Sequence, residues 1–216
     1  NDFDIRSNLK VGSTLVSEMT IAGEGELKEY DVIVIGGGMI GLAFTLALSR
    51  KKNFKIAIIE PHECNPEIRS SFHTRVSAIT PSSKDFLSSI NVWDDINRKQ
   101  GFISTRVWDQ NSHGHLNFYA KDEGIEHLGF IVENDLIQSA LYSVIAQTKV
   151  QIIHAKLDEL IKNEFGYEVT LDNKQRLFCK LVVGADGANS KVRSLANIEV
   201  SSHDYKQKAI IANVVS

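Results

Sequence analysis

Two runs of apolar residues near the start of the chain flank a helical pattern. The first run is DVIVI at residues 31–35 and the second is FKIAIIE at residues 54–60. Runs of this kind are typical of parallel strands that are buried on both faces. Between them, residues 40–50 are rich in Ala and Leu over a length that predicts a helix. Together the three segments predict a βαβ unit of about 30 residues.

The middle of the chain combines helical stripes with alternating segments. Residues 81–96 begin with Pro and Ser and predict a helix, because Phe86, Leu87, Ile90 and Trp93 follow helical spacing. Residues 134–147 predict a second helix with Asn134 as its N-cap. Extended segments are predicted at RVSAIT (75–80), at LGFIVE (128–133) and, as a hairpin around NSHG, at STRVWDQ (104–110) and HLNFYA (115–120).

The last third of the chain predicts mainly strands. These are VQIIH (150–154), KLDELIKN (156–163), YEVTLD (167–172), LFCKLVV (177–183) and, after a short helix that begins at Ser190, KAIIANVVS (208–216). A βαβ start followed by an inserted antiparallel region predicts an α/β fold with a mixed sheet.

The glycine cluster after the first predicted strand fits the pattern G-x-G-x-x-G. Gly36 permits the tight turn, Gly38 lets the backbone approach a pyrophosphate, and Gly41 lets the helix lie close to the strand. The amides of Met39 and Ile40 then open a helix whose N-terminal dipole favours negative charge. The alternative is a tight turn with a structural role only.

An acidic residue in the expected place favours the binding interpretation of this loop. Glu60 ends the second strand, 19 residues beyond Gly41, where a carboxylate can accept hydrogen bonds from ribose hydroxyls. The same carboxylate would repel a 2′-phosphate. The first half of the chain therefore predicts a site for the adenosine half of FAD or NAD.

Composition and charge exclude several other classes. The formal net charge is −3, and Lys and Arg form no stripe with interleaved aromatic residues, so nucleic acid is not an expected partner. Cys64 and Cys179 lie far apart without a second ligand pair, which argues against a disulfide framework or a zinc site and favours a reducing compartment. No apolar run approaches the roughly 20 residues that cross a bilayer.

A second glycine turn bears on the choice between FAD and NAD. The segment LVVGADGANSKVR, at residues 181–193, is a strand followed by Gly184, Asp186 and Gly187 and then by a helix with Ser190 at its start. It resembles the Asp-Gly fingerprint of flavoprotein aromatic hydroxylases, in which this segment lies near FAD and near the path of the reduced nicotinamide. The alternative is a local turn in which Asp186 only caps the helix.

Further segments narrow the resemblance, namely RVSAIT (75–80), NVWDDI (91–96), VWDQNSHGHLNF (107–118) and LGFIVENDLI (128–137). In this order and spacing the chain, from about residue 30 to 216, is similar to the ubiquinone-biosynthesis flavin hydroxylases, and closest to the bacterial 2-polyprenylphenol 6-hydroxylase. The resemblance implies a Rossmann-like three-layer FAD/NAD(P)-binding fold of the para-hydroxybenzoate hydroxylase type, with inserted antiparallel strands.

The resemblance also implies roles for individual residues. Arg75 would approach the FAD phosphates or ribityl chain, Glu133 would lie near the flavin, Asp186 and Gly187 would bind the ribityl or pyrophosphate region, and the backbone at Leu157 would pass the adenine. Each has an alternative: Arg75 could pair with a surface carboxylate, Glu133 could serve the dipole of the helix after it, and Leu157 could be core. The catalytic side chains stay unassigned.

The resemblance further implies that this chain is the N-terminal part of a longer hydroxylase. A later flavin motif of the family, Gly-Asp-Ala-Ala-His followed by Pro, does not occur here. We expect residues 1–29 to be a tail or a segment left over from cloning, residues 30–102 and 129–203 to form a discontinuous FAD-binding domain, and residues 103–128 and 204–216 to begin the sheet of a substrate domain.

In such enzymes NAD(P)H reduces FAD, and the reduced flavin uses O2 to hydroxylate an electron-rich phenol ring. The expected substrate is a polyprenylated phenol, so we expect peripheral membrane association, at the cytoplasmic side of a bacterial inner membrane or at the mitochondrial matrix face, with other ubiquinone-biosynthesis proteins as partners. The alternatives are a flavin hydroxylase of another aromatic substrate and a non-catalytic flavin-fold fragment. His113 and His115 lack a third ligand, and a polar turn is expected there in place of a metal site.

Overall fold

The computed structural model describes residues 27–51, 53–63, 72–109 and 113–214. Its largest sheet has the strand order β8-β2-β1-β11-β10-β9. The four strands β8 (Gln151–Ile153), β2 (Ile56–Ile59), β1 (Lys28–Ile35) and β11 (Arg176–Gly184) are parallel. The strands β10 (Tyr167–Leu171) and β9 (Leu157–Lys162) continue the sheet antiparallel. The predicted mixed sheet is therefore confirmed.

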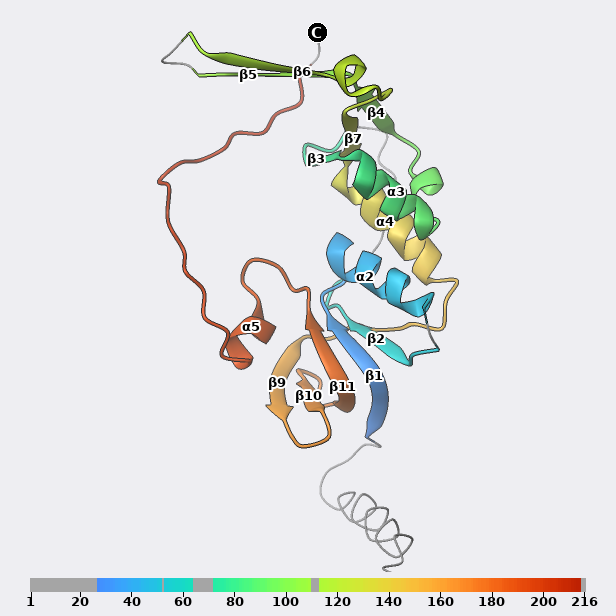
Figure 1. The fold of residues 1–216 in the computed structure, drawn as a ribbon. Helices are drawn as coiled ribbons and strands as arrows, with labels where there is room; N and C mark the ends of the chain where they lie inside the picture. The colour runs from blue at the N-terminus through green and yellow to red at the C-terminus, as the bar shows by residue number, and fades with distance from the viewer. Residues whose placement is uncertain (1–26, 52, 64–71, 110–112, 215–216) are drawn as a thin grey trace, which may run out of the picture.

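The alternation of side chains along β1 divides the core into two clusters. Val32 and Val34 face helices α2 (Met39–Ser49) and α4 (Asn134–Ile145) on one side of the sheet. Ile33 and Ile35 face the antiparallel strands and helix α5 (Lys191–Leu195) on the other side. Because β1 buries both faces, it needs an almost continuous apolar run. The result is three layers, with the helices above the parallel strands in Figure 1 and the antiparallel strands with α5 below and beside them.

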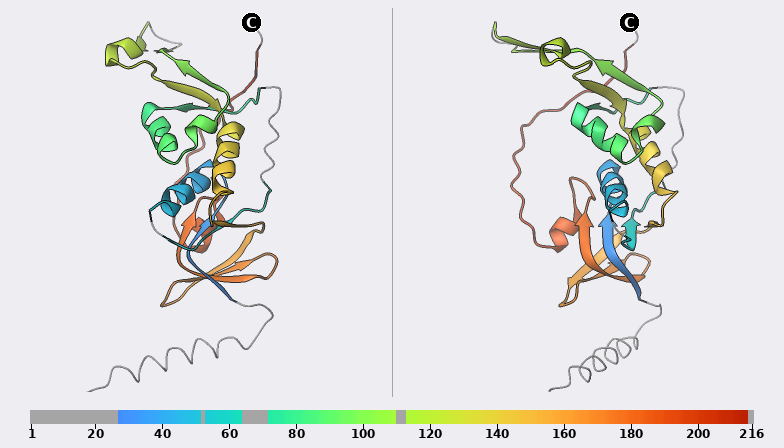
Figure 2. Two further views of the ribbon diagram at one scale, coloured as in Figure 1. Left: turned by 90° about the vertical axis from the view of Figure 1, so that its right-hand side faces the viewer. Right: turned by 45° about the vertical axis from the view of Figure 1, so that its right-hand side comes forward.

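A second region covers the far side of α4. Strands β3 (Val76–Ile79), β7 (Gly129–Glu133) and β4 (Lys99–Phe102) form a three-stranded antiparallel sheet, and β5 (Ser104–Trp108) pairs with β6 (His115–Tyr119) as the predicted hairpin. Helix α3 (Pro81–Ser89) and the short 3-10 helix η1 (Trp93–Asp95) pack against α4, while a second short 3-10 turn, η2 (Ala120–Glu123), follows β6. Figure 2 shows the hairpin projecting from the end of the molecule opposite the large sheet.

Two predicted helix features are wrong. The predicted helix 81–96 ends at Ser89, because Asn91 adopts φ 57°, a left-handed conformation that an α-helix cannot continue through. Asn134 is not the cap of α4, because its side chain instead accepts a hydrogen bond from the Ser77 hydroxyl at 2.6 Å, and Glu133 occupies the N-cap position.

The predicted strand at 208–216 is also wrong over its described part. Residues 199–214 contain no helix or strand, and Ile210 is 94% exposed. A strand requires hydrogen bonds from a neighbouring strand. None of the strands in the described ranges pairs with this segment, which runs as an extended trace toward the β5–β6 hairpin in Figure 1.

The structure also bears on the predictions about the cysteines and about membrane-spanning segments. Cys179 is buried in β11, and burial raises the pKa of its thiol to about 11, so the side chain is a neutral part of the core. Cys64, like residues 1–26 of the expected tail, lies outside the described residues. Within the ranges that are described, no helix combines the length and the apolar character that crossing a bilayer requires.

Candidate functional site

The glycine loop turns the chain from the end of β1 into α2. Gly36 adopts φ 109°, which only glycine tolerates easily, and its amide donates to the carbonyl of Ile59 at 2.8 Å. Gly38 occupies the N-cap of α2. The amides of Gly38, Met39 and Ile40 have no hydrogen-bond partner among the described residues, as the first turn of a helix requires. The loop thus presents a row of free donors.

The second loop, after β11, packs directly on the first. The Ala185 amide donates to the Ile35 carbonyl at 2.7 Å. A Cβ atom added to Gly36 would overlap the Ala185 carbonyl oxygen and would lie 2.9 Å from the Asp186 nitrogen. A Cβ on Gly41 would overlap the carbonyl oxygen of Gly36. The absence of a side chain at Gly36 and Gly41 therefore allows the two loops and α2 to come into contact. This agrees with the tight turn predicted for Gly36 and the close helix packing predicted for Gly41.

A pocket of about 700 Å³ opens between the two loops. It lies at the carboxyl ends of β1, β2 and β11. At this place the strand order reverses, because β1 has β2 as its neighbour on one side and β11 as its neighbour on the other. Such a reversal of strand order is the usual ligand position in doubly wound folds. Six of the predicted residues line the pocket: Gly36, Gly38, Glu60, Leu157, Asp186 and Gly187. The two loops therefore converge on one cavity.

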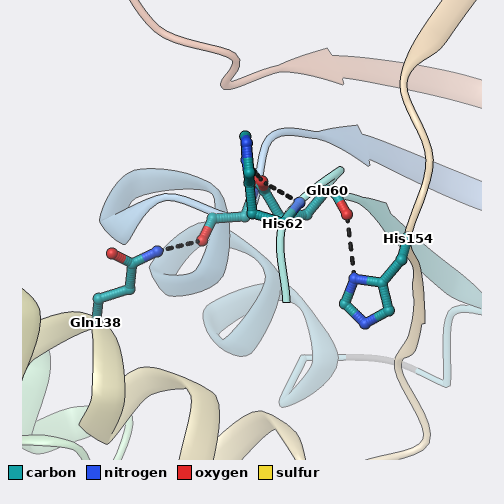
Figure 3. A network of polar contacts seen from close by, with 5 residues as sticks. Glu60, His62, Gln138 and His154 are labelled. Carbon is teal, nitrogen blue, oxygen red and sulfur yellow. Dashed lines mark hydrogen bonds and ion pairs between the residues drawn. The ribbon is translucent and has the colours of Figure 1, made fainter. Parts of the chain in front are cut away.

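Glu60 fixes the rim of this pocket. Its carboxylate accepts hydrogen bonds from the Gly37 amide at 2.7 Å and from the His62 amide at 3.1 Å, and the His62 ring lies 3.1 Å from the same oxygen as the His62 amide. The His154 ring contacts the Glu60 carbonyl at 3.2 Å, as Figure 3 shows. A carboxylate has about four acceptor positions, so Glu60 can still accept a ribose hydroxyl.

Asp186 has the capping role that was the alternative interpretation, and it also lines the pocket. Its carboxylate accepts hydrogen bonds from the Ser190 hydroxyl at 2.5 Å and from the amides of Lys191 and Val192 at 2.6 and 3.1 Å. Burial of the group acts to raise its pKa, but these hydrogen bonds outweigh burial and hold the pKa of Asp186 below its usual value. The two roles are compatible, because one carboxylate orders the loop whose backbone faces the cavity.

We expect Asp186→Asn to reduce the free energy of unfolding by on the order of 1 kcal/mol near neutral pH. Because the folded-state pKa of Asp186 is depressed, its contribution exists above the unfolded pKa and is lost as pH falls through the folded value. The difference between wild type and variant should shrink below about pH 4. Urea titrations at several pH values measure it; Asp85→Asn, at an exposed position on α3, is the control. A pH-independent difference would contradict the assignment.

Met39, Ile40 and Gly41, in the first turn of α2, do not line the pocket, and neither do Arg75 and Glu133. Glu133 is 6% exposed and forms an ion pair with Arg98, with Nε to Oε1 at 2.9 Å, and it also accepts the His73 amide at 2.7 Å. The guanidinium of Arg75 is exposed and makes no polar contact with any residue that the structure describes. Contact of either residue with a cofactor stays a prediction.

Sequence reasoning missed four residues that shape this region: Gly37, His62, Arg98 and Gln138. Gly37 occupies an unrestricted position of the glycine pattern, and His62 lies only two residues beyond Glu60, so neither had a signal of its own. Arg98 reaches Glu133 across 35 residues, and Gln138 reaches Gly37 across 101 residues. Contacts between such distant positions have no local pattern.

No metal cluster competes with this interpretation within the described ranges, where no three or more His, Cys, Asp or Glu side chains are grouped to hold an ion. His113 and His115 belong to the hairpin, at its turn and in β6. A polar turn at that place stays a prediction, because residues 110–112 lie outside the described part.

The donors and the open space fit a dinucleotide. A Cβ atom on Gly38 or Gly187 would meet nothing within 4 Å, so both backbones face free space beside the unpaired amides of the helix start. Glu60 supplies a carboxylate at the end of the neighbouring strand, and Leu157 adds an apolar wall. Pyrophosphate, ribose and base each have a suitable partner here.

Sequence comparisons with known proteins support a dinucleotide site in this pocket. The profile of a family described as FAD binding domain matches residues 29–216. The mouse protein "Ubiquinone biosynthesis monooxygenase COQ6, mitochondrial" is 31% identical, with 94% of this chain and 46% of the mouse protein covered. The "3-demethoxyubiquinol 3-hydroxylase" of Escherichia coli K12 is 32% identical, with 85% and 48% covered. The chain thus spans about half the length of these curated relatives, and the predicted resemblance to ubiquinone-biosynthesis hydroxylases is confirmed.

Solved structures confirm the fold. PqsL of Pseudomonas aeruginosa superposes with a TM-score of 0.65 at 19% identity, covering 82% of this chain and 48% of that one. The p-nitrophenol 4-monooxygenase PnpA of Pseudomonas putida gives 0.61 at 18% identity, covering 78% and 43%. The three-layer α/β fold with inserted antiparallel strands was correctly predicted.

Proposed function

The chain belongs to the family of FAD-binding domains whose profile covers residues 29–216, and on that premise we propose that its protein is an FAD-dependent monooxygenase that hydroxylates a polyprenylated phenol in ubiquinone biosynthesis. The observation that carries the proposal is the convergence of two glycine loops, separated by about 150 residues, on a single pocket at the switch point of the sheet. The names of the relatives support the substrate class.

We assign the pocket to the ADP half of FAD. The amides of Gly38, Met39 and Ile40 would bind the pyrophosphate, Glu60 a ribose hydroxyl, and the backbone at Leu157 would lie beside the adenine. Asp186 and Gly187 would approach the ribityl side, with Arg75 and Glu133 beyond it. When bound, FAD supplies the redox chemistry with NAD(P)H and O2 as cosubstrates. The residues of this chain bind and orient it.

We further propose the domain division that the sequence predicts. Residues 30–102 and 129–203 would form the FAD-binding domain, and residues 103–128 and 204–216 would begin the sheet that covers the substrate. The exposed apolar side chains of the hairpin, among them Val107, Leu116 and Phe118, support this, because such side chains usually pack against a partner. A prenylated substrate also supports peripheral membrane association, at the face on which ubiquinone is made.

The proposal is tested with the full-length protein in two steps. A purified protein with the visible absorbance of bound oxidised flavin is expected, together with NAD(P)H- and O2-dependent hydroxylation of a prenylated phenol presented in lipid vesicles. Turnover of soluble phenols only would favour a hydroxylase of another aromatic substrate. A colourless protein that cannot be reconstituted with FAD would contradict the proposal and favour the non-catalytic fragment.

We expect Glu60→Gln to weaken FAD binding about tenfold, because hydrogen bonds to a charged acceptor are stronger than those to an amide by roughly 1 kcal/mol or more. The variant keeps the size of the side chain, so the fold should be retained. Titration of flavin fluorescence measures the dissociation constant. Glu159→Gln removes the same charge from an exposed position of β9 outside the pocket and should leave the affinity unchanged. Equal affinities for both variants would refute the role of Glu60.

A further inference from the structure

The peptide groups on both sides of Gly37 are held by two different layers of the fold. The Gly37 amide donates to the Glu60 carboxylate at 2.7 Å, and its carbonyl accepts from the Gln138 Nε2 atom at 3.0 Å. Glu60 follows β2, whereas Gln138 belongs to α4 and reaches the loop from the helical layer (Figure 3). A Cβ on Gly37 would lie 2.8 Å from Glu60 Cγ and 3.0 Å from the Tyr142 hydroxyl. The buried Gly37 thus has little freedom to rotate.

Fixing the Gly37 carbonyl also fixes the next amide. The peptide bond between Gly37 and Gly38 is planar and trans, so the Gly38 N–H points opposite to the Gly37 carbonyl. That carbonyl points toward α4, and no residue of α4 lines the pocket, whereas Gly38 does. The Gly38 N–H has no partner among the described residues. The hydrogen bond from Gln138 to the Gly37 carbonyl therefore orients the free Gly38 N–H away from α4, toward the side on which the pocket lies.

We infer that Gln138 is a positioning residue for the phosphate-binding amide of Gly38. The inference rests on the proposed dinucleotide site and adds to it a residue outside the pocket. Without the Gln138 amide, the buried Gly37 carbonyl would lack its partner, and the Gly37–Gly38 peptide would rotate to find another. The Gly38 N–H would then leave the orientation that a pyrophosphate oxygen requires. Glu60 would still hold the preceding peptide, so the change stays local.

A purely structural role for Gln138 predicts a different result. If Gln138 only satisfied a buried carbonyl, its loss would loosen the whole pocket and weaken all ligands alike. A positioning role concerns the diphosphate alone. ADP, which carries a diphosphate, and adenosine, which does not, therefore separate the two cases.

The experiment compares Gln138→Leu with Gln147→Leu in the full-length protein. Gln147 lies just beyond the C-terminal end of α4, and among the described residues its side chain donates a hydrogen bond only to the nearby Ser143 carbonyl. We expect Gln138→Leu to weaken ADP and FAD binding about tenfold by calorimetry, equivalent to about 1.4 kcal/mol, while adenosine binding changes less than about twofold. Gln147→Leu should match wild type. An unchanged ADP affinity, or an equal loss for adenosine, would overturn the inference.

A measurement without ligand distinguishes a failure of the Gln138 inference from a failure of the proposed function. In NMR spectra of the ligand-free chain, the Gly38 amide resonance should shift in Gln138→Leu and stay in place in Gln147→Leu. If wild type bound neither ADP nor FAD, the proposed function would fail, and the positioning of a phosphate-binding amide would fail with it. If wild type binds both and the Gly38 resonance does not move in Gln138→Leu, only the role of Gln138 is overturned.

Discussion

Replacing Gly36 by alanine is expected to lower the free energy of unfolding by about 3 kcal/mol and to abolish FAD binding. Two effects add. Gly36 adopts φ 109°, where a side chain introduces backbone strain, and its Cβ would overlap the carbonyl oxygen of Ala185. The obstruction is backbone, so it cannot be relieved by a rotamer change. Relief requires the second loop to move away, and that movement separates Gly38 from Asp186.

Two matched variants isolate the causes. Gly124 also has a positive φ, 67°, but a Cβ there meets nothing within 4 Å, so Gly124→Ala should cost about 1 kcal/mol through strain alone and leave FAD binding intact. Gly38→Ala meets no atom within 4 Å and should spare stability while weakening FAD binding. Urea denaturation and flavin titration measure both quantities. If Gly36→Ala lost no more stability than Gly124→Ala, close contact between the loops would be refuted.

The features that were predictable from sequence are those in which neighbours along the chain decide the outcome. The βαβ unit follows from two β-branched runs and a glycine turn, and Glu60 follows from its place at the end of a buried strand. The turn at Asp186 was equally visible, because Ser190 and the helix after it lie within a few residues. That both loops lie near one FAD is implied only by the resemblance, and the structure supplies a physical basis for it in the close approach of Gly36 to Ala185.

The prediction errors and omissions arise where contacts between residues distant in the sequence determine the structure. The apolar stripe of residues 81–96 continues past Ser89, but Asn91 turns the chain so that Trp93 can pack against Phe130, with ring centroids 5.1 Å apart. KAIIANVVS has the composition of a strand, yet composition does not supply a neighbour to pair with. Glu133 was visible as a candidate, but its partner Arg98 lies in a loop with no pattern that points to it.

Helix α4 connects both parts of the candidate site. Glu133 precedes its first turn and holds the segment around Arg75: the Glu133 carboxylate accepts the His73 amide, and the Asn134 amide donates to the Arg75 carbonyl at 3.1 Å. Gln138, just over one turn later, holds the first glycine loop. A change at the start of α4 should therefore reach both the amides that we propose to bind phosphate and the arginine that we place toward the flavin.

Arg98→Met is expected to lower the free energy of unfolding by roughly 2–3 kcal/mol, more than removal of both charges together. The variant leaves the Glu133 carboxylate, 6% exposed, without its cation, whereas Arg98 keeps 31% of its side chain in water, which places the effect at the lower end for buried pairs. In Arg98→Met with Glu133→Leu, no unpaired charge remains.

The double variant should therefore be more stable than Arg98→Met alone, because an apolar pair can replace a buried ion pair at little cost, while an uncompensated carboxylate cannot be accommodated. Urea denaturation of the wild type, both single variants and the double variant completes the cycle. Additive losses would show that the carboxylate and the guanidinium act independently and would remove the anchor that we assign to the Arg75 segment. If Arg98→Met were less stable than the double variant, the ion pair would be what holds the Arg75 segment in place. Only a Glu133 carboxylate that depends on Arg98 destabilises the fold when the arginine is lost.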